Sequence, residues 1–453
     1  MTTHTYLSLF CGLGGLSLGF QRQGFGCVGA FDFNNEACKD HLYLTGHPAT
    51  PVDLAAITPE QLRRRCGERR PDVVATSPPC KSFSGCLPAQ TAMTAKYQAM
   101  SNLAYRGIWL ALEAWKDAPP PLFVMENVPR IQSRGRQWLD ELQELFRSYG
   151  YACRETTHDC GELGGLAQSR QRFLLVARHQ RQTPQWMYVP EKYPLRGIGE
   201  VIGGLPIPLP GCNRGGPMHE LTRLSALNWL RLALIPAGGD WRDIPESVGL
   251  SCEPRATAYG VERWEASSGT VVGAACHDNG GFSIADPRID YSPRSGTLRV
   301  HREDLPAGTV IGEARSNKGF NVADGRIARP THSVTADSQG ELLVSGPSLD
   351  LEAQGSADPV PIIRAEDGTW HRPMTTLELA ALQGLPVKVD GEWLSLAGGS
   401  KKRHRQRIGN AVPPAAAEAI AKECKAVLEA AQDGGIVLSS RPVWVDSDRQ
   451  VPA

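Results

Sequence analysis

The sequence predicts an open, mostly parallel α/β sheet, accompanied by a smaller domain that is rich in β structure or irregular. Three observations support this fold class. Short apolar runs alternate with amphipathic segments up to about residue 178, the stretch from about 180 to 343 is rich in glycine and proline, and a helical pattern returns at Thr375. The chain has 453 residues, of which 41% are hydrophobic and 21% charged, so it can bury a sizeable core.

The first part of the chain gives the elements of the sheet in order. The apolar run 5–10 is expected to be a buried strand that ends in a glycine-rich turn, followed by a helix at about 16–23 and a second strand at 27–33. The later elements are strands at 72–77, 121–127 and 172–178 and helices at about 95–115 and 136–148. Strands that alternate with helices are typical of a parallel sheet with crossover connections.

The second part of the chain has a different character. It contains one clear helical pattern, at 221–234, and a weak internal repeat in which residues 269–289 resemble residues 308–327. Two copies are too few for a solenoid, so we interpret them as a duplicated hairpin-like unit. The helical pattern at 375–386 and a long amphipathic helix from about Pro414 then complete the chain before a polar tail.

Composition excludes several classes of protein. No run of about 18 apolar residues is present that would span a membrane, and the N-terminus lacks the pattern of a signal peptide, so a cytoplasmic location is expected. The 12 cysteines are scattered singly, without a CxxC pair or a Cys/His cluster at zinc spacing. We therefore expect reduced thiols and no metal.

The charge of the chain gives no global signal for nucleic acid, because the formal net charge is +0. Two local basic clusters exist, at 63–70 and 401–407. Taken alone, each is more typical of a solvated surface than of a binding site.

A glycine-rich turn between a strand and a helix is where α/β proteins bind cofactors. The turn comprises Gly12, Leu13, Gly14 and Gly15. Ser17 stands where the dinucleotide pattern GxGxxG needs glycine, so a nicotinamide or flavin cofactor is disfavoured. Asp32, at the end of the second strand, could accept hydrogen bonds from ribose hydroxyls, and Asp53 could accept one from an adenine amino group. A purely structural turn explains the glycines about as well.

Cys80 lies at the carboxyl end of a predicted strand, at the same sheet edge as the glycine-rich turn. Pro78 and Pro79 precede it, and prolines restrict the backbone and help to fix the position of the sulfur. A thiolate in such a place can act as a nucleophile. The alternative is a buried cysteine that serves as a small apolar side chain.

Charged groups also lie at the end of one predicted strand and at the start of another. Glu126 follows a run of apolar residues, so burial is expected to raise its pKa and leave it partly protonated near neutral pH. Seen alone, it could equally cap a helix or pair with an arginine. Arg170 and Arg172 lie at the start of a third strand, where alternation predicts that both guanidinium groups point at one anionic site.

In chain order, these stretches resemble the motifs of the DNA (cytosine-5) methyltransferase family. The similar stretches are FCGLGG for the cofactor turn, PPCKSFS for the catalytic-cysteine loop, MENV for the glutamate motif, QSRQR for the double-arginine motif, LQGLP for the ninth motif and IGNAVPP for the tenth. Six motifs in the family's order make a coincidence improbable. The long variable stretch stands where that family carries its target recognition domain.

The resemblance implies a class I S-adenosylmethionine-dependent methyltransferase fold, which is a Rossmann-like mixed sheet with helices on both faces. It also implies a smaller target recognition domain that is β-rich or irregular. The expected boundaries are a catalytic and cofactor-binding domain at 1–180, the target recognition domain at 181–374, a return to the catalytic domain at 375–432, and a loosely held tail at 433–453.

The resemblance also assigns residues to two binding sites. The cofactor would be S-adenosylmethionine, converted to S-adenosylhomocysteine without a metal. Its expected contacts are Phe10, Gly12, Leu13, Gly14, Gly15, Asp32, Phe33, Asp53, Leu54, Pro78, Asn410, Ala411 and Val412. The expected DNA contacts are Lys81, Ser84, Lys401, Lys402, Arg403 and Arg405, the last four because the basic cluster adjoins the tenth motif.

The implied reaction is methylation of carbon 5 of cytosine within a specific short sequence of duplex DNA. The target base would be flipped out of the duplex, and the Cys80 thiolate would add to carbon 6. Glu126 would hydrogen-bond or protonate ring nitrogen 3. Arg170 would hold the cytosine carbonyl and Arg172 would support it.

Some positions depart from the family pattern. Asn34 stands where a second acidic residue is frequent, so the ribose contact would depend mainly on Asp32. Leu377 and Ala381 stand where the ninth motif usually has arginines, so the docking of the recognition domain is expected to differ. None of these departures removes a catalytic group.

Two other functions remain open, a tRNA cytosine-5 methyltransferase of the same fold and an inactive paralogue that binds DNA. The long region between 178 and 375 favours duplex DNA, and the presence of Cys80 and Glu126 favours an active enzyme. The expected state is a monomer with duplex DNA as its partner and no membrane contact. A cognate restriction endonuclease is a further expected partner if the chain belongs to a restriction-modification system.

Overall fold

The computed structural model describes most of the chain. The described residues are 4–79, 95–184, 186–208, 214–244, 258–288, 301–302, 333–336, 342–345, 365, 367–434 and 440–445. Cys80, Lys81, Ser84 and the second copy of the internal repeat lie outside them. None of the helices within these ranges is both long and apolar enough to cross a membrane.

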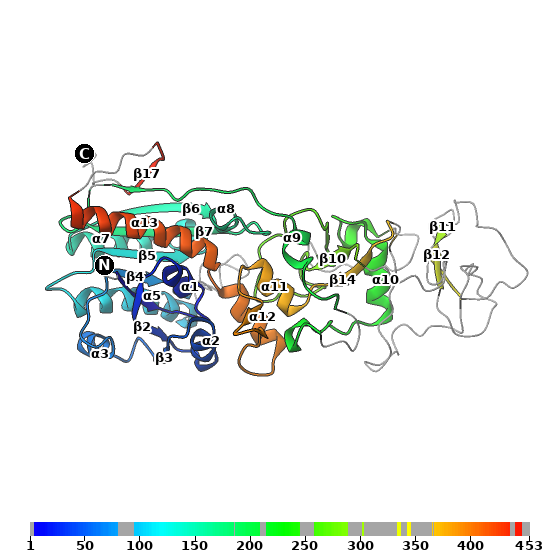
Figure 1. Ribbon diagram of the computed structural model, residues 1–453, viewed down its shortest axis with the longest axis horizontal. Coiled ribbons are helices and arrows are strands. Elements are labelled where there is room, and N and C mark those ends of the chain that lie inside the picture. The colour runs from blue at the N-terminus through cyan, green and yellow to red at the C-terminus, as the bar shows by residue number, and fades with distance from the viewer. Residues whose placement is uncertain are drawn as a thin grey trace, which may run out of the picture.

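A seven-stranded mixed sheet forms one lobe of the molecule (Figure 1). Its strands, in spatial order, are β3 (Thr50–Pro51), β2 (Gly26–Asp32), β1 (Thr5–Leu9), β4 (Val73–Thr76), β5 (Leu122–Asn127), β7 (Gln171–His179) and β6 (Tyr151–Asp159). The strands from β3 to β5 are all parallel, whereas β7 runs antiparallel to both of its neighbours. The mostly parallel α/β sheet predicted from the sequence is therefore confirmed, and β3 and β6 are the two strands of this sheet that the sequence prediction missed.

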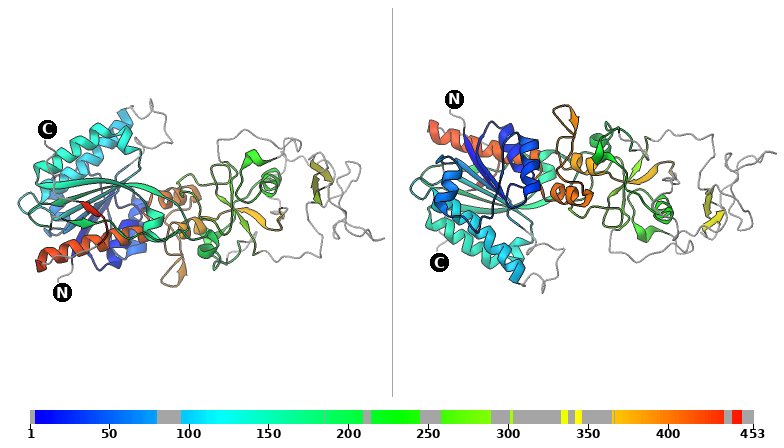
Figure 2. Two further views of the ribbon diagram at one scale, coloured as in Figure 1. Left: turned by 90° about the horizontal axis from the view of Figure 1, so that it is seen from above. Right: turned by 90° about the horizontal axis from the view of Figure 1, so that it is seen from below.

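Helices cover both faces of this sheet (Figure 2). One face carries α3 (Pro59–Arg65), α5 (Ala95–Ala114) and α7 (Arg136–Ser148), and the other carries α1 (Gly15–Arg22) and α13 (Pro414–Asp433). Each face has its own apolar core, one around Phe123 and Phe146 and the other around Phe20 and Ile420. Smaller helices on this lobe are α2 (Asn35–Thr45), α6 (Ile131–Arg134) and α8 (Cys160–Gly164). Helix α13 thus returns the C-terminal part of the chain to the first sheet.

The segment 440–445 corrects the expectation of a loosely held tail. Strand β17 (Val443–Val445) pairs with β8 (Met187–Tyr188), and Trp444 is only 1% exposed. The indole Nε1 of Trp444 donates to Thr156 Oγ1 at 2.8 Å. The expectation is wrong for this segment because a buried aromatic side chain anchors it to the sheet lobe.

A second lobe extends from the sheet lobe and contains little regular structure (Figure 1). Its elements are α9 (Ile198–Ile202), the 3₁₀ turns η1 (Pro217–His219) and η2 (Trp241–Asp243), α10 (Ala226–Leu234), β9 (Val261–Glu262), β10 (Ser283–Asp286), β14 (Trp370–Pro373), α11 (Thr376–Leu382), β15 (Lys388–Val389), β16 (Glu392–Trp393) and α12 (Lys401–Asn410). Strands β14, β10 and β9 form one sheet, and β11 (His301–Arg302), β12 (Ser333–Ala336) and β13 (Leu342–Ser345) form another. The domain boundaries expected from the sequence stay a prediction.

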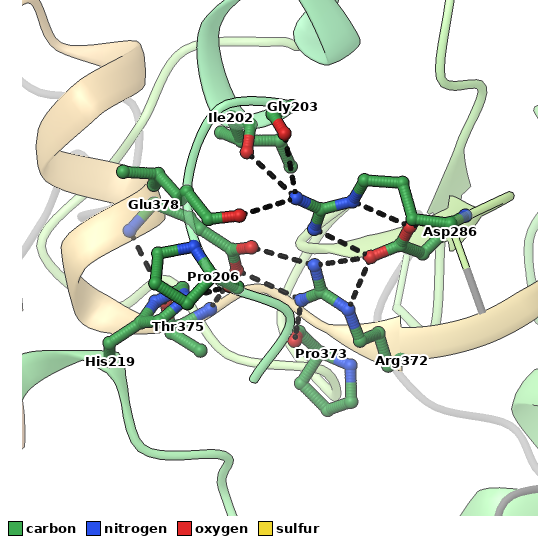
Figure 3. A network of polar contacts seen from close by, with 11 residues as sticks. Ile202, Gly203, Pro206, His219, Asp286, Arg372, Pro373, Thr375 and Glu378 are labelled. Atoms are coloured by element: carbon green, nitrogen blue, oxygen red, sulfur yellow. Dashed lines mark hydrogen bonds and ion pairs between the residues drawn. The ribbon is translucent and has the colours of Figure 1, made fainter. Parts of the chain in front are cut away.

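A buried ion cluster joins β10, β14 and α11 in this lobe (Figure 3). The Arg372 guanidinium donates to Asp286 at 2.8 Å and to Glu378 at 2.6 Å, and all three side chains are fully buried. Arg288 adds a second contact to Asp286, at 2.8 Å. Burial by itself raises the pKa of Asp286, but hydrogen bonds from Arg288 and the charges of both arginines lower that pKa to about 2.

The two residues that depart from the ninth motif lie in helix α11. Leu377 and Ala381 are buried among apolar side chains. A buried guanidinium reaches the same helix from Arg372, on the preceding strand, and donates to Glu378.

Candidate functional site

A cavity of about 460 Å³ lies where several strands of the sheet end. Parallel strands have their carboxyl ends at one edge of a sheet, so residues that follow β1, β2 and β4 gather there. The predicted residues that line the cavity are Phe10, Gly12, Leu13, Gly15, Asp32, Phe33, Asp53, Leu54, Pro78, Glu126, Arg170, Arg172, Asn410, Ala411 and Val412. Gly14 belongs to the same turn but is not among the lining residues; a Cβ there would meet Thr45 and His41 of α2 instead.

The glycine-rich turn fits tightly against the segment of the tenth motif. A Cβ atom at Gly15 would lie 2.0 Å from the carbonyl oxygen of Val412, so only glycine allows this approach. Gly14 has a φ of 100°, a left-handed conformation that suits glycine. The two segments, almost 400 residues apart in the chain, therefore form adjoining walls of one cavity.

Two carboxylates lie at the end of the cavity formed by β2. The backbone N–H groups of Gly12 and Asn34 donate to the Asp32 carboxylate at 2.9 and 2.8 Å. Burial raises the pKa of Asp32, and these backbone hydrogen bonds offset only part of that rise. Asp53 also lines the cavity, and its Oδ1 accepts from the backbone of Ala55 at 2.9 Å.

Asn34 has a structural role as well as a place in the cavity lining. Its Oδ1 accepts from the backbone N–H groups of Glu36 and Ala37 at 3.0 and 3.2 Å, so it is the N-cap of α2.

The same end of the cavity has a face suited to a flat ring. Phe33 is 78% exposed although it follows a buried strand, and it lines the cavity together with Leu54 and Val52. A purine can stack on an aromatic side chain, while carboxylates accept hydrogen bonds from ribose hydroxyls and amino groups. These residues therefore fit the adenosine part of S-adenosylmethionine.

Glu126 is held firmly at the other end of the cavity. Ser77 Oγ donates to Glu126 Oε2 at 2.7 Å, and Arg172 Nε lies 2.9 Å from Oε1. The Glu126 and Arg172 side chains are 7% and 12% exposed. The pairing with an arginine that the sequence left open is thus present, and Ser77 is a partner that sequence reasoning did not identify, although it immediately follows a strand.

Arg170 makes different contacts from Arg172. It is 1% exposed, and its terminal nitrogens donate to the carbonyl oxygens of Val271 (2.9 Å), Gly409 (2.8 Å) and Ala411 (3.1 Å). Strand β7 begins at Gln171, so alternation along a strand does not relate the two arginines. The alternation argument therefore does not fix the directions of the two guanidinium groups; both residues line the cavity, and their joint contact with one anionic site stays a prediction.

Gln168 extends this junction between the two lobes. Its Nε2 donates to Leu382 O and Gln383 Oε1 at 2.9 and 2.8 Å, and its Oε1 accepts from Val271 N at 3.2 Å. Gln168 also forms a parallel bridge with Ser268. No local sequence pattern signals these contacts, because they join residues at least 100 positions apart.

The second basic cluster of the sequence, residues 401–407, lies in helix α12. Lys401 Nζ lies 2.6 Å from Glu220, Arg403 lies 3.4 Å from Glu36, and Arg405 donates to the Ala275 carbonyl oxygen at 2.7 Å. Lys402 is exposed and pairs with no acidic side chain in the part of the chain that the structure describes. Contact of these four residues with DNA stays a prediction.

The predicted nucleophile, Cys80, and the predicted DNA contacts Lys81 and Ser84 lie outside the described residues. The two residues before Cys80, Pro78 and Pro79, line the cavity. Asn127 Nδ2 donates to the Pro78 carbonyl oxygen at 3.4 Å, a contact that links this segment to the end of β5.

The model of one protein family matches most of the chain. That family is described as C-5 cytosine-specific DNA methylase, and the match covers residues 4–198 and 300–426. The type II methylase M.HgiDII of Herpetosiphon aurantiacus is 26% identical over 298 residues, which is 63% of this chain and 79% of that protein. The type II methyltransferase M1.HphI of Haemophilus parahaemolyticus is 28% identical over 246 residues, which is 54% of this chain and 64% of that protein.

A solved structure shares the fold. It is that of a candidate DNA modification methyltransferase encoded within a prophage (E. coli), with a TM-score of 0.58 and 16% sequence identity. The superposition covers 94% of this chain and 100% of the other. The mixed sheet and its helices are therefore those of a methyltransferase fold.

Proposed function

Since this chain belongs to the C-5 cytosine-specific DNA methylase family and is a DNA cytosine methyltransferase, we propose that it methylates carbon 5 of cytosine within one short sequence of duplex DNA. The methyl donor is S-adenosylmethionine. One observation carries the proposal, namely that the Ser77–Glu126–Arg172 group and the aromatic and acidic edge at Phe33, Asp32 and Asp53 line the same cavity.

The cofactor would lie at the β2 end of the cavity. Asp32 and Asp53 would accept hydrogen bonds from its ribose and adenine, and Phe33 would cover the adenine ring. When bound, S-adenosylmethionine supplies an electrophilic methyl group. The residues of this edge bind and orient the donor, while Asn410 to Val412 close the cavity from the opposite wall.

Cys80 is the proposed nucleophile. Carbon 5 of cytosine reacts poorly, so the Cys80 thiolate would form a bond to carbon 6 of a flipped-out base and push an electron pair toward carbon 5. Carbon 5 would then take the methyl group. A base or water would remove the carbon 5 proton, and the returning electron pair would expel the thiolate. The lining positions of Pro78 and Pro79 support this placement of the loop.

Glu126 and Arg172 would act on the ring of the cytosine. Glu126 would hydrogen-bond or protonate nitrogen 3 and so reduce the charge that builds up during the attack. Arg172 contacts Glu126 directly, so we assign the cytosine carbonyl to Arg172. Arg170, whose terminal nitrogens donate to three backbone carbonyls, is a positioning residue that holds the wall formed by Gly409 and Ala411.

Duplex DNA is the proposed partner, and a monomer is the proposed state. The long region between residues 178 and 375 supports a domain that reads duplex DNA, and hence DNA rather than tRNA. The relatives are named as type II enzymes, which supports a restriction-modification role with a cognate endonuclease. The alternatives are methylation of tRNA and a chain that binds DNA without turnover. The latter is disfavoured because Cys80 and Glu126 are both present.

Bisulfite sequencing tests the proposal directly. Unmethylated plasmid DNA is incubated with the protein and S-adenosylmethionine, and protected cytosines are expected in one short context only. A Cys80→Ala variant is the control and should protect none. Protection that persists in the control, or no protection by a folded wild-type protein that still binds the cofactor, would overturn the proposal; methyl transfer to tRNA would then be measured.

A further inference from the structure

A second cavity, of about 570 Å³, lies in the second lobe. Its walls come from the η2 turn, strand β9, the segment 269–272 and the loop before β10. The lining residues are Gly238, Gly239, Asp240, Arg242, Asp243, Gly260, Val261, Glu262, Gly269, Thr270, Val272, Asn279, Gly280, Gly281 and Phe282. Six of these fifteen residues are glycine, so much of the wall is bare backbone that a flat ligand can approach closely.

The segment 268–273 separates this cavity from the catalytic one. On one side, the Val271 carbonyl oxygen accepts from Arg170, and a Cβ at Gly409 would lie 2.4 Å from the carbonyl carbon of Val272. On the other side, Gly269, Thr270 and Val272 line the second cavity. Arg170 and Gly409 line the catalytic cavity. A duplex that delivers a flipped base to the first cavity would therefore bring neighbouring base pairs to the second.

Glu262 is the group in this cavity that is suited to recognising a base. It is partly buried, and it forms no ion pair within the described part of the chain. Its carboxylate accepts a hydrogen bond from the backbone of Gly269, and burial raises its pKa. A Cβ at Gly281 would lie 2.4 Å from Glu262 Oε1, so the glycine makes room for the carboxylate.

The other acidic side chains of the cavity are already engaged. Asp240 pairs with Arg242 at 2.5 Å, and Asp243 Oδ2 accepts from the backbone of Asp240 at 2.7 Å. These contacts close the η2 turn on itself. Glu262, by contrast, is partly buried and forms no ion pair within the described part of the chain, so its carboxylate can accept from a ligand in addition to Gly269. A carboxylate discriminates in favour of groups that donate hydrogen bonds.

We propose that this cavity receives the major-groove edge of a base pair that flanks the target cytosine, and that Glu262 accepts a hydrogen bond from the exocyclic amino group of that base. The matching donors are N4 of cytosine and N6 of adenine. The inference rests on the proposed function, because it names the group that sets the sequence context of the same reaction. Guanine and thymine present acceptors at this edge, so the Glu262 carboxylate would disfavour them.

The test uses duplexes that carry the methylated context found by bisulfite sequencing. At each flanking position in turn, cytosine or adenine is replaced by an analogue that lacks only the amino group. For wild-type protein, kcat/KM is expected to fall roughly tenfold or more at one position. The identity of the base at that position shows whether the donor is cytosine or adenine.

Glu262→Ala links that position to this side chain, because it removes the side-chain acceptor altogether. In the variant the loss of the amino group should cost less than threefold at the same position, because the two changes remove one contact. Glu265→Ala, at an exposed glutamate three residues away and outside the cavity, is the matched control and should respond as wild type does. A Glu262→Ala variant that responds as wild type does at every position would overturn the inference.

The wild-type measurement alone also decides the matter if the variant fails to fold. If no amino-group deletion slows a wild-type protein that methylates the duplex, the inference is wrong while the proposed function stands. If the wild-type protein methylates no duplex at all, the proposed function fails first and the inference fails with it.

Discussion

The catalytic cavity and the cavity of the second lobe differ in the structural elements that form them. The catalytic cavity is formed where strands end, and its polar side chains are held by neighbours at hydrogen-bonding distance, as Glu126 is by Ser77 and Arg172. The second cavity is formed by loops, and six of its fifteen lining residues are glycine. The segment 268–273 lies between them.

This difference matches what each cavity would have to do. Covalent chemistry needs a few side chains at fixed positions, and the ends of buried strands provide such positions. Recognition of a base pair needs a surface that the duplex can approach, and bare backbone provides that. Substitutions in the first cavity should therefore change rate, whereas those in the second should change sequence preference.

The largest effect is expected at Glu126. Glu126→Gln keeps the shape of the side chain but cannot transfer a proton to nitrogen 3, so kcat should fall by about 10²- to 10⁴-fold. Methyl transfer to a duplex measures the rate, and calorimetry measures cofactor affinity, which should stay unchanged. Ser77→Ala removes one hydrogen bond to the same carboxylate and should cost far less. A Glu126→Gln variant with near-normal kcat would break the assignment.

The two arginines provide the next comparison. Arg172→Lys should lower kcat with little change in stability, because it alters a contact to Glu126 within the cavity. Arg170→Ala should lower the free energy of unfolding by about 3 kcal/mol or more, because three buried carbonyls lose their donor. It should also raise KM for the cofactor. Thermal unfolding and steady-state kinetics separate the two. Equal stability of both variants would contradict the positioning role of Arg170.

The sequence predicted the catalytic cavity better than it predicted the contacts inside it. Strand ends can be located from apolar runs, so the placement of Asp32 and Glu126 at one edge followed from patterning alone. The separate contacts of Arg170 and Arg172 did not, because Arg170 precedes the first residue of β7, Gln171, and alternation along a strand does not fix where its guanidinium points.

The second lobe was predictable only as an irregular region. Its contacts join residues that are far apart in the chain, such as Arg170 with Val271 and Arg372 with Asp286. Loop backbones have no periodicity that would indicate such partners in advance. The charges of α12 were likewise visible in the sequence, while the pairing of Lys401 with Glu220 was not.

The ion cluster of the second lobe predicts sensitivity to acid. The folded-state pKa of Asp286 is lowered to about 2. The contribution of its carboxylate to the free energy of unfolding is therefore complete above the unfolded-state pKa near 4, and it is lost as the pH falls through 2. The free energy of unfolding should decrease by about 2 kcal/mol over this window from this group alone. Denaturant titrations at several pH values measure it. Asp286→Asn should flatten this part of the dependence, and an unchanged slope would contradict it.

Substitution of Asp32 should have a smaller effect, which is confined to the affinity for the cofactor. Asp32→Asn keeps an acceptor for the ribose but removes the charge and weakens the contact with Gly12 N–H. S-adenosylmethionine should bind about tenfold more weakly, as expected for one hydrogen bond to a charged group. Calorimetry checks this. Asp53→Asn provides the parallel measurement at the adenine end. Unaltered binding in both variants would contradict the placement of the cofactor at this edge of the cavity.

The smallest effect is expected on helix α12, which adjoins both lobes. Lys402 is exposed, so Lys402→Ala should remove about one phosphate contact and make the slope of log K against log salt concentration less negative by about 0.9. Arg405 donates to a backbone carbonyl, so Arg405→Ala should disturb the segment near Ala275 as well as any phosphate contact. Lys422→Ala, on the outer helix α13, is the control for the loss of a surface charge. If Lys402→Ala and Lys422→Ala change the slope equally, the basic helix does not lie along the duplex, and the path of the DNA must be set by the two cavities alone.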